Sequence, residues 1–501
     1  MKRNVIVIIL IVIGLIWYFF RGSNNNNNND NNSRNTDNQD QNSNNDDKDK
    51  GKGWIRDTAK FNNTYIFTPL DPNSPDNQLP SSVSLRQYAP TPMNQGEQGS
   101  CTGWSTSYAA RTILESVASG SDPNNAPFSP SYIFNQEHGS NCNGAVMYDV
   151  LTKLSQEGTL PLSEFPYDAR SCDRTPSSQQ RNEAHSYKIL GFNRLTNGQN
   201  FNIDLTSMKQ NIAKGAPVII GMPVGGTLMN LARNENNGLW KPTDNDYNAL
   251  EDFRNGDYRR SGLGGHAICV IGYDDNKFGG SVEIQNSWGK DFGDGGFFWM
   301  KYKDFKNFCM EAYGLFPFPS AKANTNQTFK ASLGLIINKT KENITFKSKQ
   351  GNVFETKNIL PDGTKFKVQI NNSTPCYVYV IGQDTDGSSY TLFPYTKKHS
   401  PFCGITGTRT FPTDYSMQLD NVGNKDVIAF ILTKSAIDIN KIKDLVTKST
   451  GTTYAQKIKE ALNDALINDS EITFSTDKTI NIEVGKTNKN AVAIVMEINK
   501  K

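Results

Sequence analysis

Residues 91–117 read TPMNQGEQGSCTGWSTSYAARTILESV, and the cysteine inside this stretch stands in an unusual setting. A loop rich in Pro and Gly ends at Ser100, and apolar residues with helical spacing follow from Thr102. Cys101 therefore lies where a loop meets the start of a helix. The partial positive charge of a helix N-terminus favours a thiolate over a thiol, so Cys101 is a candidate nucleophile. Taken alone, such a cysteine is more often a small buried side chain.

Two later segments contain the groups that would activate such a thiol: GLGGHAICVIGYDD at 262–275 and VEIQNSWGKDFGDGGFFWM at 282–300. The first indicates a strand over Ala267 to Tyr273, with His266 at its entrance. The second indicates a strand that ends at Asn286. An imidazole paired with a cysteine gives an ion-pair nucleophile, and an amide side chain can orient that imidazole. Trp288, beside the amide, could keep water off their hydrogen bond.

Together these three segments resemble the papain/cathepsin-type cysteine peptidases, over roughly Leu79 to Phe318. The shared pattern is Gln-Gly ahead of Gly-Ser-Cys, then His-Ala in a strand ending in Gly-Tyr, then Asn-Ser-Trp-Gly, in the same chain order. The resemblance implies an α+β, two-lobed fold with a helical lobe and a β-barrel-like lobe. It implies these roles: Cys101 as nucleophile, His266 as general acid/base, Asn286 as orienter, Gln95 and the Cys101 N–H as oxyanion hole, and Trp288 as shield.

The chemistry implied by this resemblance is acyl transfer without a cofactor. The thiolate attacks a peptide carbonyl, the imidazolium protonates the leaving amine, and water then hydrolyses the thioester. No His/Cys cluster has zinc spacing, so we expect no metal. Peptide or protein substrates are the expected partners, and 53 basic against 50 acidic residues argue against nucleic acid. Two alternatives stay open: a catalytically inactive binding protein with this fold, and a transpeptidase that uses an amine acceptor.

Further positions are implied more weakly. NCNGAVMYDVLTKLSQEGTLPLSEFPYD, at 141–168, resembles the strip that binds substrate backbone in the family. Asn143 and Gly144 would bind substrate there, and Ala267 would border the pocket for the second residue before the scissile bond. The family's usual disulfide cysteine three residues before the nucleophile is Gln98 here, which leaves the strip cysteine without that partner. Cys142 therefore either pairs with Cys172, or the two residues remain separate buried thiols.

Two segments depart from the family pattern in length. Cys101 and His266 are 165 residues apart, more than the family's ~130–150. We place the excess in Gly225 to Gly264, either as a loop that limits substrates or as a surface insertion without function. The segment Trp54 to Pro80 looks too short for the family's helical inhibitory propeptide. Either no zymogen exists, which we favour, or this segment blocks the cleft in a simpler way.

The N-terminal residues predict a membrane anchor and a tether. Val5 to Phe20 is an uncharged apolar run after Lys2 and Arg3, just long enough to span a bilayer. It lacks the small residues of a cleavage site, which favours an uncleaved anchor over residues 1–22, with a cleaved signal as the alternative. Residues 23–53 are Asn-rich and predict a disordered tether. The body is then expected outside the cytoplasm, periplasmic or at the cell surface, or secreted if the signal is cleaved.

The C-terminal part has a different sequence pattern. Short β-type runs separated by turns predict a mostly-β sandwich at residues 331–501, joined by a linker, 321–330, to a peptidase domain at 54–320. One helical insertion is expected at about Asp438 to Leu466. The runs TPCYVYVIGQDTDGSSYTLFPYT, TRTFPTDYSMQLD and NKDVIAFILTKSAID resemble a bacterial envelope domain of unknown function. It is expected to bind an envelope partner or to act as a spacer, and Cys376 and Cys403 could pair within it.

Overall fold

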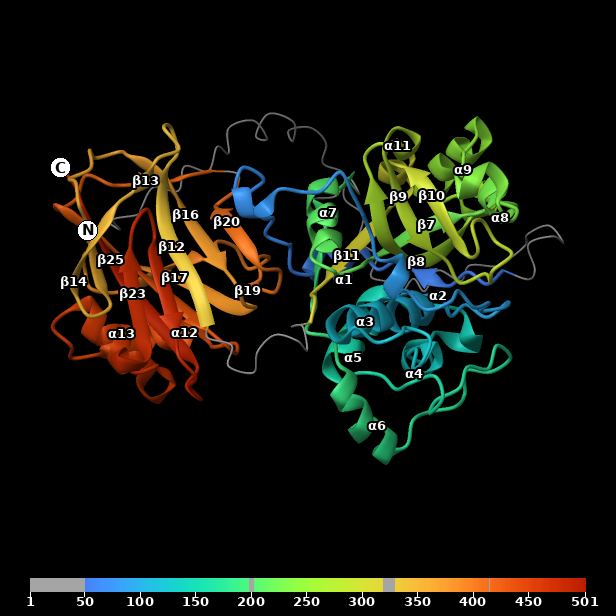
Figure 1. Cartoon of the computed structure of the whole chain (residues 1–501), viewed down its shortest axis with the longest axis horizontal. Coiled ribbons are helices and arrows are strands. Elements are labelled where there is room, and N and C mark those ends of the chain that lie inside the picture. Colours follow the sequence, from blue (N-terminus) through green and yellow to red (C-terminus); the bar gives the residue numbers. More distant parts are fainter. Residues whose placement is uncertain (1–49, 198–201, 319–328, 414) are drawn as a thin grey trace, which may run out of the picture.

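The computed structural model describes residues 50–197, 202–318, 329–413 and 415–501. They form two bodies, a two-lobed α+β body followed by a mostly-β body (Figure 1). The expected anchor at 1–22 and all but the last four residues of the expected tether lie outside the described residues. Across the described ranges, no helix is both long and apolar enough to span a membrane.

The first lobe is helical and begins at the candidate nucleophile. One continuous helix runs from Cys101 to Ser119, with wider π-type turns in its middle part. Its apolar side is buried, including Ile113 and Leu114. The helices of this lobe are α2 (Cys101–Gly103), η4 (Trp104–Arg111), α3 (Thr112–Ser119), α4 (Pro130–Glu137), α5 (Met147–Gln156) and α6 (Ser178–Ala184).

The second lobe is a seven-stranded sheet in the order β10-β9-β8-β7-β11-β4, with β2 paired to β8. Its strands are β2 (Ser82–Ser84), β4 (Phe192–Arg194), β7 (Val218–Val224), β8 (Gly264–Asp274), β9 (Ser281–Gln285), β10 (Phe297–Lys301) and β11 (Glu311–Leu315). Every residue of β7 is buried, as expected for a central strand covered on both faces. The predicted strand from Ala267 to Tyr273 is the middle of β8. Helices α7 (Leu205–Ala213) and α11 (Tyr302–Phe308) accompany this sheet.

The predicted extra segment between Gly225 and Gly264 is folded. It contains α8 (Gly226–Met229), η7 (Glu235–Gly238), α9 (Asp244–Arg254) and α10 (Tyr258–Ser261), which Figure 1 shows at the outer end of the sheet. A buried carboxylate holds it together, because Asp246 accepts hydrogen bonds from Thr227 and from Thr243, the N-cap residue of α9. The Trp240 indole donates to the Thr227 hydroxyl at 2.9 Å.

The C-terminal body is a sandwich of two seven-stranded sheets. One has the order β20-β16-β12-β24-β23, with β13 and β21 at its side; the other has the order β14-β15-β25-β22-β17-β18, with β19 at its side. The strands are β12 (Phe329–Ile337), β13 (Asn343–Ile344), β14 (Phe346–Gln350), β15 (Val353–Thr356), β16 (Lys365–Asn372), β17 (Cys376–Gln383), β18 (Ser389–Phe393), β19 (Phe402–Cys403), β20 (Gly407–Phe411), β21 (Met417–Gln418), β22 (Lys425–Thr433), β23 (Ile472–Thr476), β24 (Ile480–Val484) and β25 (Ala491–Asn499). Alternating residues of β16 point into the core, the pattern of a half-buried strand.

The expected helical insertion is present in the sandwich as α12 (Ile439–Lys448) and α13 (Tyr454–Leu462). Its apolar residues form a second core with the outer face of the sheet that contains β22 and β25. Cys376 and Cys403 lie directly opposite each other on β17 and β19, and both are free thiols in this structure. The pairing that the sequence left open is therefore not formed here.

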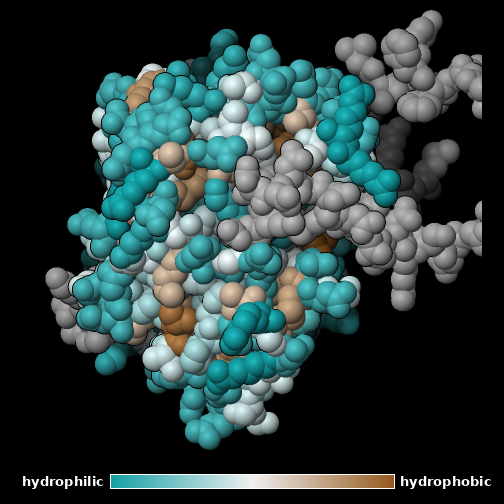
Figure 2. All heavy atoms as spheres, turned by 90° about the vertical axis from the view of Figure 1, so that its right-hand side faces the viewer, coloured by the Kyte–Doolittle hydropathy of each residue, from teal (hydrophilic) through white to brown (hydrophobic). Residues whose placement is uncertain are grey.

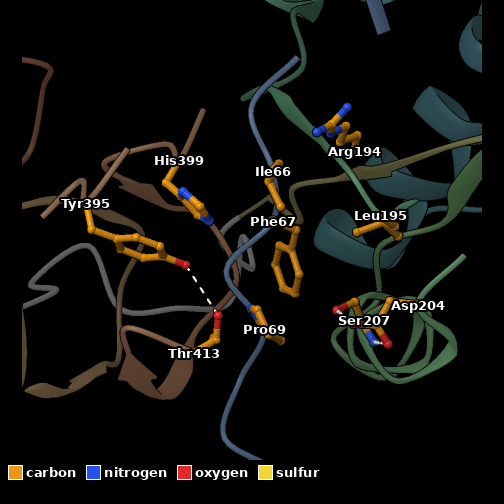
Figure 3. A pocket seen from close by; sticks show the side chains of 10 residues that line it. All are labelled: Ile66, Phe67, Pro69, Arg194, Leu195, Asp204, Ser207, Tyr395, His399 and Thr413. Carbon is orange, nitrogen blue, oxygen red and sulfur yellow. Dashed lines mark hydrogen bonds between the residues drawn. The ribbon is translucent and has the colours of Figure 1, made fainter. Parts of the chain in front are cut away.

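The N-terminal segment connects the two bodies before the peptidase-like lobes begin. It contains β1 (Trp54–Ile55), α1 (Thr58–Asn63) and η2 (Pro75–Asn77). Residues Ile66 to Asn77, which we call the strap, run between the bodies and contact both (Figure 1). A cavity of about 430 Å³ lies beside the strap (Figure 3), lined by Ile66, Phe67, Pro69, Arg194, Leu195, Asp204, Ser207, Tyr395, His399 and Thr413.

Candidate active site

Cys101 is the first residue of the long helix and is completely buried. The Ala267 N–H donates to its Sγ at 3.3 Å, which brings β8 of the second lobe against the start of the helix. Burial raises the pKa of the Cys101 thiol to about 12, although N–H groups of Ala267 and Gly53 pull it down. In this conformation the thiol is therefore protonated, and the helix N-terminus does not overcome the loss of solvent.

His266 lies on β8, and its Nε2 is 2.8 Å from Oδ1 of Asn286, the residue after β9. Trp288 stacks on the imidazole with ring centroids 4.5 Å apart. Burial lowers the pKa of His266 to about 4, against the hydrogen bond that its ring N–H donates to Asn286, and nearby Lys52 lowers it further. Among the described residues, the second ring nitrogen, Nδ1, has no hydrogen-bond partner. The imidazole is thus held in one orientation and is neutral.

Gln95 comes from the loop before the helix and is also fully buried. Its Nε2 donates to the Gln98 carbonyl at 2.8 Å, and its Oε1 accepts from the Ser287 hydroxyl at 2.5 Å. Ser287 lies between Asn286 and Trp288. Within these three residues, Ser287 bonds Gln95, Asn286 bonds the edge of the imidazole, and Trp288 stacks on the face of the ring. The structure brings together all four residues that the sequence predicted for catalysis, together with Trp288.

The predicted substrate strip lies on the helical lobe, ahead of α5, and faces β8 across the cleft. Gly144 has a φ of +88° and is buried, whereas Asn143 is exposed. A Cβ at Gly144 would lie 2.3 Å from the Gly53 carbonyl oxygen, so only glycine permits the close approach of another backbone here. Cys142 and Cys172 form a disulfide with Cα atoms 5.8 Å apart, which ties the strip to the segment after it.

The cleft between the lobes is filled by residues Lys50 to Ile55, which we call the plug. The Gly53 N–H donates to the Gly265 carbonyl of β8 at 2.8 Å, and the Gly53 carbonyl accepts from Ala145 N–H at 2.8 Å. Beyond this point β1 runs parallel to β3 (Ala145–Val146). The structure thus places in the cleft the last residues of the expected tether, together with Trp54 and Ile55, the first residues of the segment that was the alternative blocking element.

A pocket in the second lobe receives the side chain of Trp54, which is 1% exposed. Two glycines form its walls, because a Cβ at Gly221 or Gly265 would collide with the indole or its backbone. At its end, Glu311 Oε2 accepts from the indole Nε1 at 3.2 Å. Burial raises the pKa of Glu311 to about 8, against the bond from Trp54 and the charge of Arg56.

Some contributors to the cleft were not predicted from sequence. Ala145 supplies the strip N–H, the Gly265 carbonyl faces it, and Glu311 closes the pocket. Ala145 follows the predicted Gly144, and Gly265 precedes His266, so adjacency to the predicted residues was the available signal. No sequence signal pointed to Glu311, because it lies on β11 and is distant in the chain from the predicted residues. The face that contains the two lobes is mostly hydrophilic with small separate apolar patches (Figure 2).

Comparison with known proteins gives two family matches. Residues 79–317 match the model described as papain family cysteine protease, and residues 359–436 match a domain of unknown function, DUF4384. Cathepsin B-like CP2 of Giardia intestinalis is 24% identical over 259 residues, covering 50% of this chain and 79% of the relative. Cysteine proteinase 3 of Entamoeba histolytica is 25% identical, covering 46% of this chain and 65% of the relative.

Solved structures are similar over the same half of the chain. Xylellain, a cysteine protease from Xylella fastidiosa, is 25% identical with a TM-score of 0.42, covering 55% of this chain and 98% of that one. The cysteine protease CMS1MS2 of Carica candamarcensis is 22% identical with a TM-score of 0.36, covering 48% of this chain and 100% of that one.

Proposed function

Because the chain carries a papain-family cysteine protease domain, followed by a domain of unknown function, we propose that Cys101, His266 and Asn286 hydrolyse peptide bonds in its cleft. The observation that carries the proposal is the geometry around the imidazole: Asn286 holds Nε2 at 2.8 Å, Trp288 covers the ring, and Nδ1 is unengaged within the described part of the chain. Nδ1 is then the nitrogen that takes the thiol proton.

The proposed reaction has two halves. His266 removes the proton from Cys101, and the thiolate attacks the substrate carbonyl to form a tetrahedral oxyanion. The imidazolium protonates the leaving amine, a thioester remains on Cys101, and water activated by the neutral imidazole hydrolyses it. Gln95 Nε2 and the Cys101 N–H would stabilise both oxyanions. Each such donor typically contributes about 100- to 1000-fold in rate.

Substrate would occupy the path that the plug takes in this structure. Gly144 and Ala145 would then face its backbone on one side and Gly265 on the other, as they face Gly53 now. A side chain of the substrate would enter the pocket that holds the Trp54 indole. The comparisons favour this peptidase over the inactive binding protein and the transpeptidase.

Labelling of Cys101 by an epoxide thiol inhibitor tests the proposal, and the cleft is opened first by Gly53→Val. A Cβ at Gly53 would lie 1.9 Å from the Gly99 carbonyl oxygen, so valine cannot occupy the plug position. We expect labelling of Gly53→Val and at least a 100-fold slower rate when His266→Ala is added. Ala59→Val, at an exposed position of α1, is the matched control. An unreactive Cys101 in the opened chain would contradict the proposal.

Peptide-library products separate hydrolysis from transfer. With Gly53→Val we expect new carboxyl termini from hydrolysis, with or without an added amine, and none with Cys101→Ala added. If products appear only when the amine is present, the chain is a transpeptidase.

We further propose that the body acts outside the cytoplasm, anchored by residues 1–22 and tethered through residues 23–49, since residues 50–53 of the expected tether lie in the cleft. The Cys142–Cys172 disulfide supports this location, because such bonds persist in oxidising compartments. Protease treatment of intact cells should remove the body, and protection from it would contradict the location. The C-terminal body is proposed to bind a partner in the cell envelope.

A further inference from the structure

The loop from Gln95 to Ser100 positions both groups that would bind the oxyanion. One is the Gln95 amide at its start, and the other is the N–H of Cys101, the residue directly after its end. Two of the six loop residues are glycines, which restrict the backbone least, and none is a cysteine that a disulfide could use. The contacts made by the rest of the helical lobe therefore decide where the two donors point.

A single hydroxyl holds both ends of this loop. Tyr167 Oη lies 2.7 Å from the Gln95 carbonyl oxygen and 2.7 Å from Ser100 Oγ. A carbonyl can only accept, so the one phenol proton goes to Gln95, and the Ser100 hydroxyl donates to the Tyr167 oxygen. Burial raises the pKa of Tyr167, which keeps this proton in place at neutral pH. The two ends of the loop are thus fixed to one oxygen atom.

The Ser100 hydroxyl makes this bond instead of capping the helix. Ser100 precedes the first residue of the long helix, where a serine hydroxyl ordinarily accepts an N–H of the first turn. Its hydroxyl makes no such bond here, although its carbonyl accepts from the Gly103 and Trp104 N–H groups at 2.9 and 3.1 Å. The residue is completely buried. Its side chain therefore serves the loop, and it fixes the backbone that leads into Cys101.

The middle of the loop is held by the residue after Tyr167. Gln98, which is 6% exposed, donates from its side-chain Nε2 to the Asp168 carbonyl at 3.2 Å. The Gln98 carbonyl in turn accepts from Gln95 Nε2 and from the Ser100 N–H, both at 2.8 Å. Because this carbonyl takes one Nε2 hydrogen and Ser287 holds Oε1, the Gln95 amide has one N–H left for an oxyanion.

Residues 167–172, which we call the clamp, are themselves tied to the helical lobe at both ends. The Tyr167 ring packs edge-on against Trp104 of the long helix, with ring centroids 4.9 Å apart. At the other end, the disulfide from Cys172 to Cys142 joins the clamp to the predicted substrate strip. The clamp therefore fixes the loop relative to the helix that carries the nucleophile and relative to the strip.

We propose that Tyr167 is a positioning residue, which aligns the Gln95 amide and the Cys101 N–H for the oxyanion. This assignment rests on the proposed function, because the alignment of these donors matters only if an oxyanion forms. Without the Tyr167 hydroxyl, the Gln95 carbonyl and the Ser100 hydroxyl lose their shared partner, and the two ends of the loop are no longer joined. Substrate binding and proton transfer from the thiol use other groups, so the loss should fall on the chemical step.

Single-turnover cleavage of a peptide by Tyr167→Phe in the Gly53→Val background tests this role. We expect the maximal rate to fall about 10-fold, less than the loss of a whole oxyanion donor. The substrate concentration at half-maximal rate should stay within about twofold. Alkylation of Cys101 by iodoacetamide forms a C–S bond, releases iodide and passes through no oxyanion. Its rate should therefore also stay within about twofold.

Tyr108→Phe, in the same background, is the matched control. Tyr108 also packs against Trp104, with ring centroids 4.8 Å apart. Its hydroxyl donates to the Thr91 carbonyl at 2.6 Å, so the variant removes an equivalent bond outside the loop. Its cleavage rate should match that of the Gly53→Val parent.

A double variant tests whether Tyr167 acts through Gln95. Gln95→Ala alone should lower the cleavage rate about 100-fold. Tyr167→Phe added to it should then cost about threefold or less, with the remainder due to the Cys101 N–H. Ser100→Ala removes only the second bond of the Tyr167 hydroxyl, and it should lower the cleavage rate about threefold without changing alkylation.

Several outcomes would overturn the assignment. They are an unchanged cleavage rate in Tyr167→Phe, an equal fall in cleavage and alkylation, a change confined to the half-saturating concentration, or a full 10-fold loss on top of Gln95→Ala. If the Gly53→Val parent is alkylated but cleaves no peptide, the failure is that of the proposed function. Thermal unfolding reports whether each variant is folded. If Tyr167→Phe is not, the result for Ser100→Ala decides, and an unchanged cleavage rate there overturns the assignment.

Discussion

The plug and the strap belong to the same N-terminal segment but are held in opposite ways. The plug fits through glycines and one indole, with hydrogen bonds that are mostly backbone to backbone. The strap is held through side chains from both bodies. Gln210 of α7 bonds both backbone groups of Leu70, at 2.9 and 2.8 Å. The plug is thus held mainly by backbone contacts and one side chain, and the strap by side chains of both bodies.

On the C-terminal side, the strap covers the outer edge of β20. The Asp71 N–H donates to the Thr408 carbonyl at 2.9 Å, and the Asn77 side chain bonds both backbone groups of that same residue. Arg409, 2% exposed, donates to the Thr68 carbonyl at 3.3 Å. An edge strand with unpaired backbone groups is a liability that proteins cover. The strap is therefore part of the C-terminal fold as well as a connection.

The largest expected difference between the strap and the plug comes from replacing one glycine at each of them by valine. Gly407 faces the strap, and a Cβ there would lie 2.5 Å from Asn77 Oδ1, at a φ of +138°. Gly407→Val should lower the unfolding temperature by several degrees and leave Cys101 labelling slow. Gly53→Val should do the reverse, with labelling raised about 100-fold. Fast labelling of Gly407→Val would show that the strap also controls the cleft.

Stability is expected to depend on pH through Glu311, which bonds Trp54 of the plug. The pKa of Glu311 is about 8 in the folded chain against 4.5 ordinarily. Between these values the native state holds a proton that the unfolded chain has lost, so the free energy of unfolding falls as the pH rises. From pH 6.5 to 8 this fall should be about 2 kcal/mol and absent in Glu311→Gln.

Denaturant titrations at these two pH values measure the Glu311 effect. The interval begins at the ordinary value of 6.5 for His266, whose lowered pKa adds a smaller rise in the free energy of unfolding near that end, equal in the wild type and in Glu311→Gln. Trp240→Phe should shift the unfolding free energy at both values by the same amount. An equal fall in the wild type and in Glu311→Gln would mean that Glu311 is solvated in the folded chain.

The smallest effect is expected from a single bond of the strap. Asp71 Oδ2 accepts from the Thr410 hydroxyl at 2.5 Å. Asp71→Ala should cost about 1 kcal/mol and lower the unfolding midpoint by about 2–4 °C, without changing the labelling rate. Thr410→Val should give a similar loss, and the double variant should not add the two. Additive losses would show that the bond does not contribute.

Local sequence was sufficient to predict that the candidate catalytic groups lie together, because each lies next to a turn or strand end that its own neighbours specify. Cys101 follows a Gly-rich loop, and His266 and Asn286 mark the edge of the same pair of strands. The sandwich, too, could be predicted from its alternating runs. The order of its strands could not, because cross-strand pairing such as Cys376 with Cys403 depends on which turns bring distant residues together.

The plug could not be predicted, since its glycines have meaning only beside Gly99 and Gly144, and no local pattern joins them. The same holds for Glu311, whose pocket is formed by strands that are distant in the chain. The membrane anchor at 1–22 remains a prediction, because those residues lie outside the described ranges. The disulfide partner of Cys142 depended on the path of the segment up to Cys172.

The bond from Ser287 to Gln95 has a consequence for how the two lobes cooperate. Gln95 belongs to the helical lobe and Ser287 to the sheet lobe, and the Gln95 N–H also donates to the Ser287 carbonyl at 2.8 Å. The amide that would bind the oxyanion and the imidazole that would transfer the proton are therefore both positioned by residues 286–288. Sliding of the lobes at this point would have to break both bonds between Gln95 and Ser287, so these bonds fix the position of the amide relative to the imidazole.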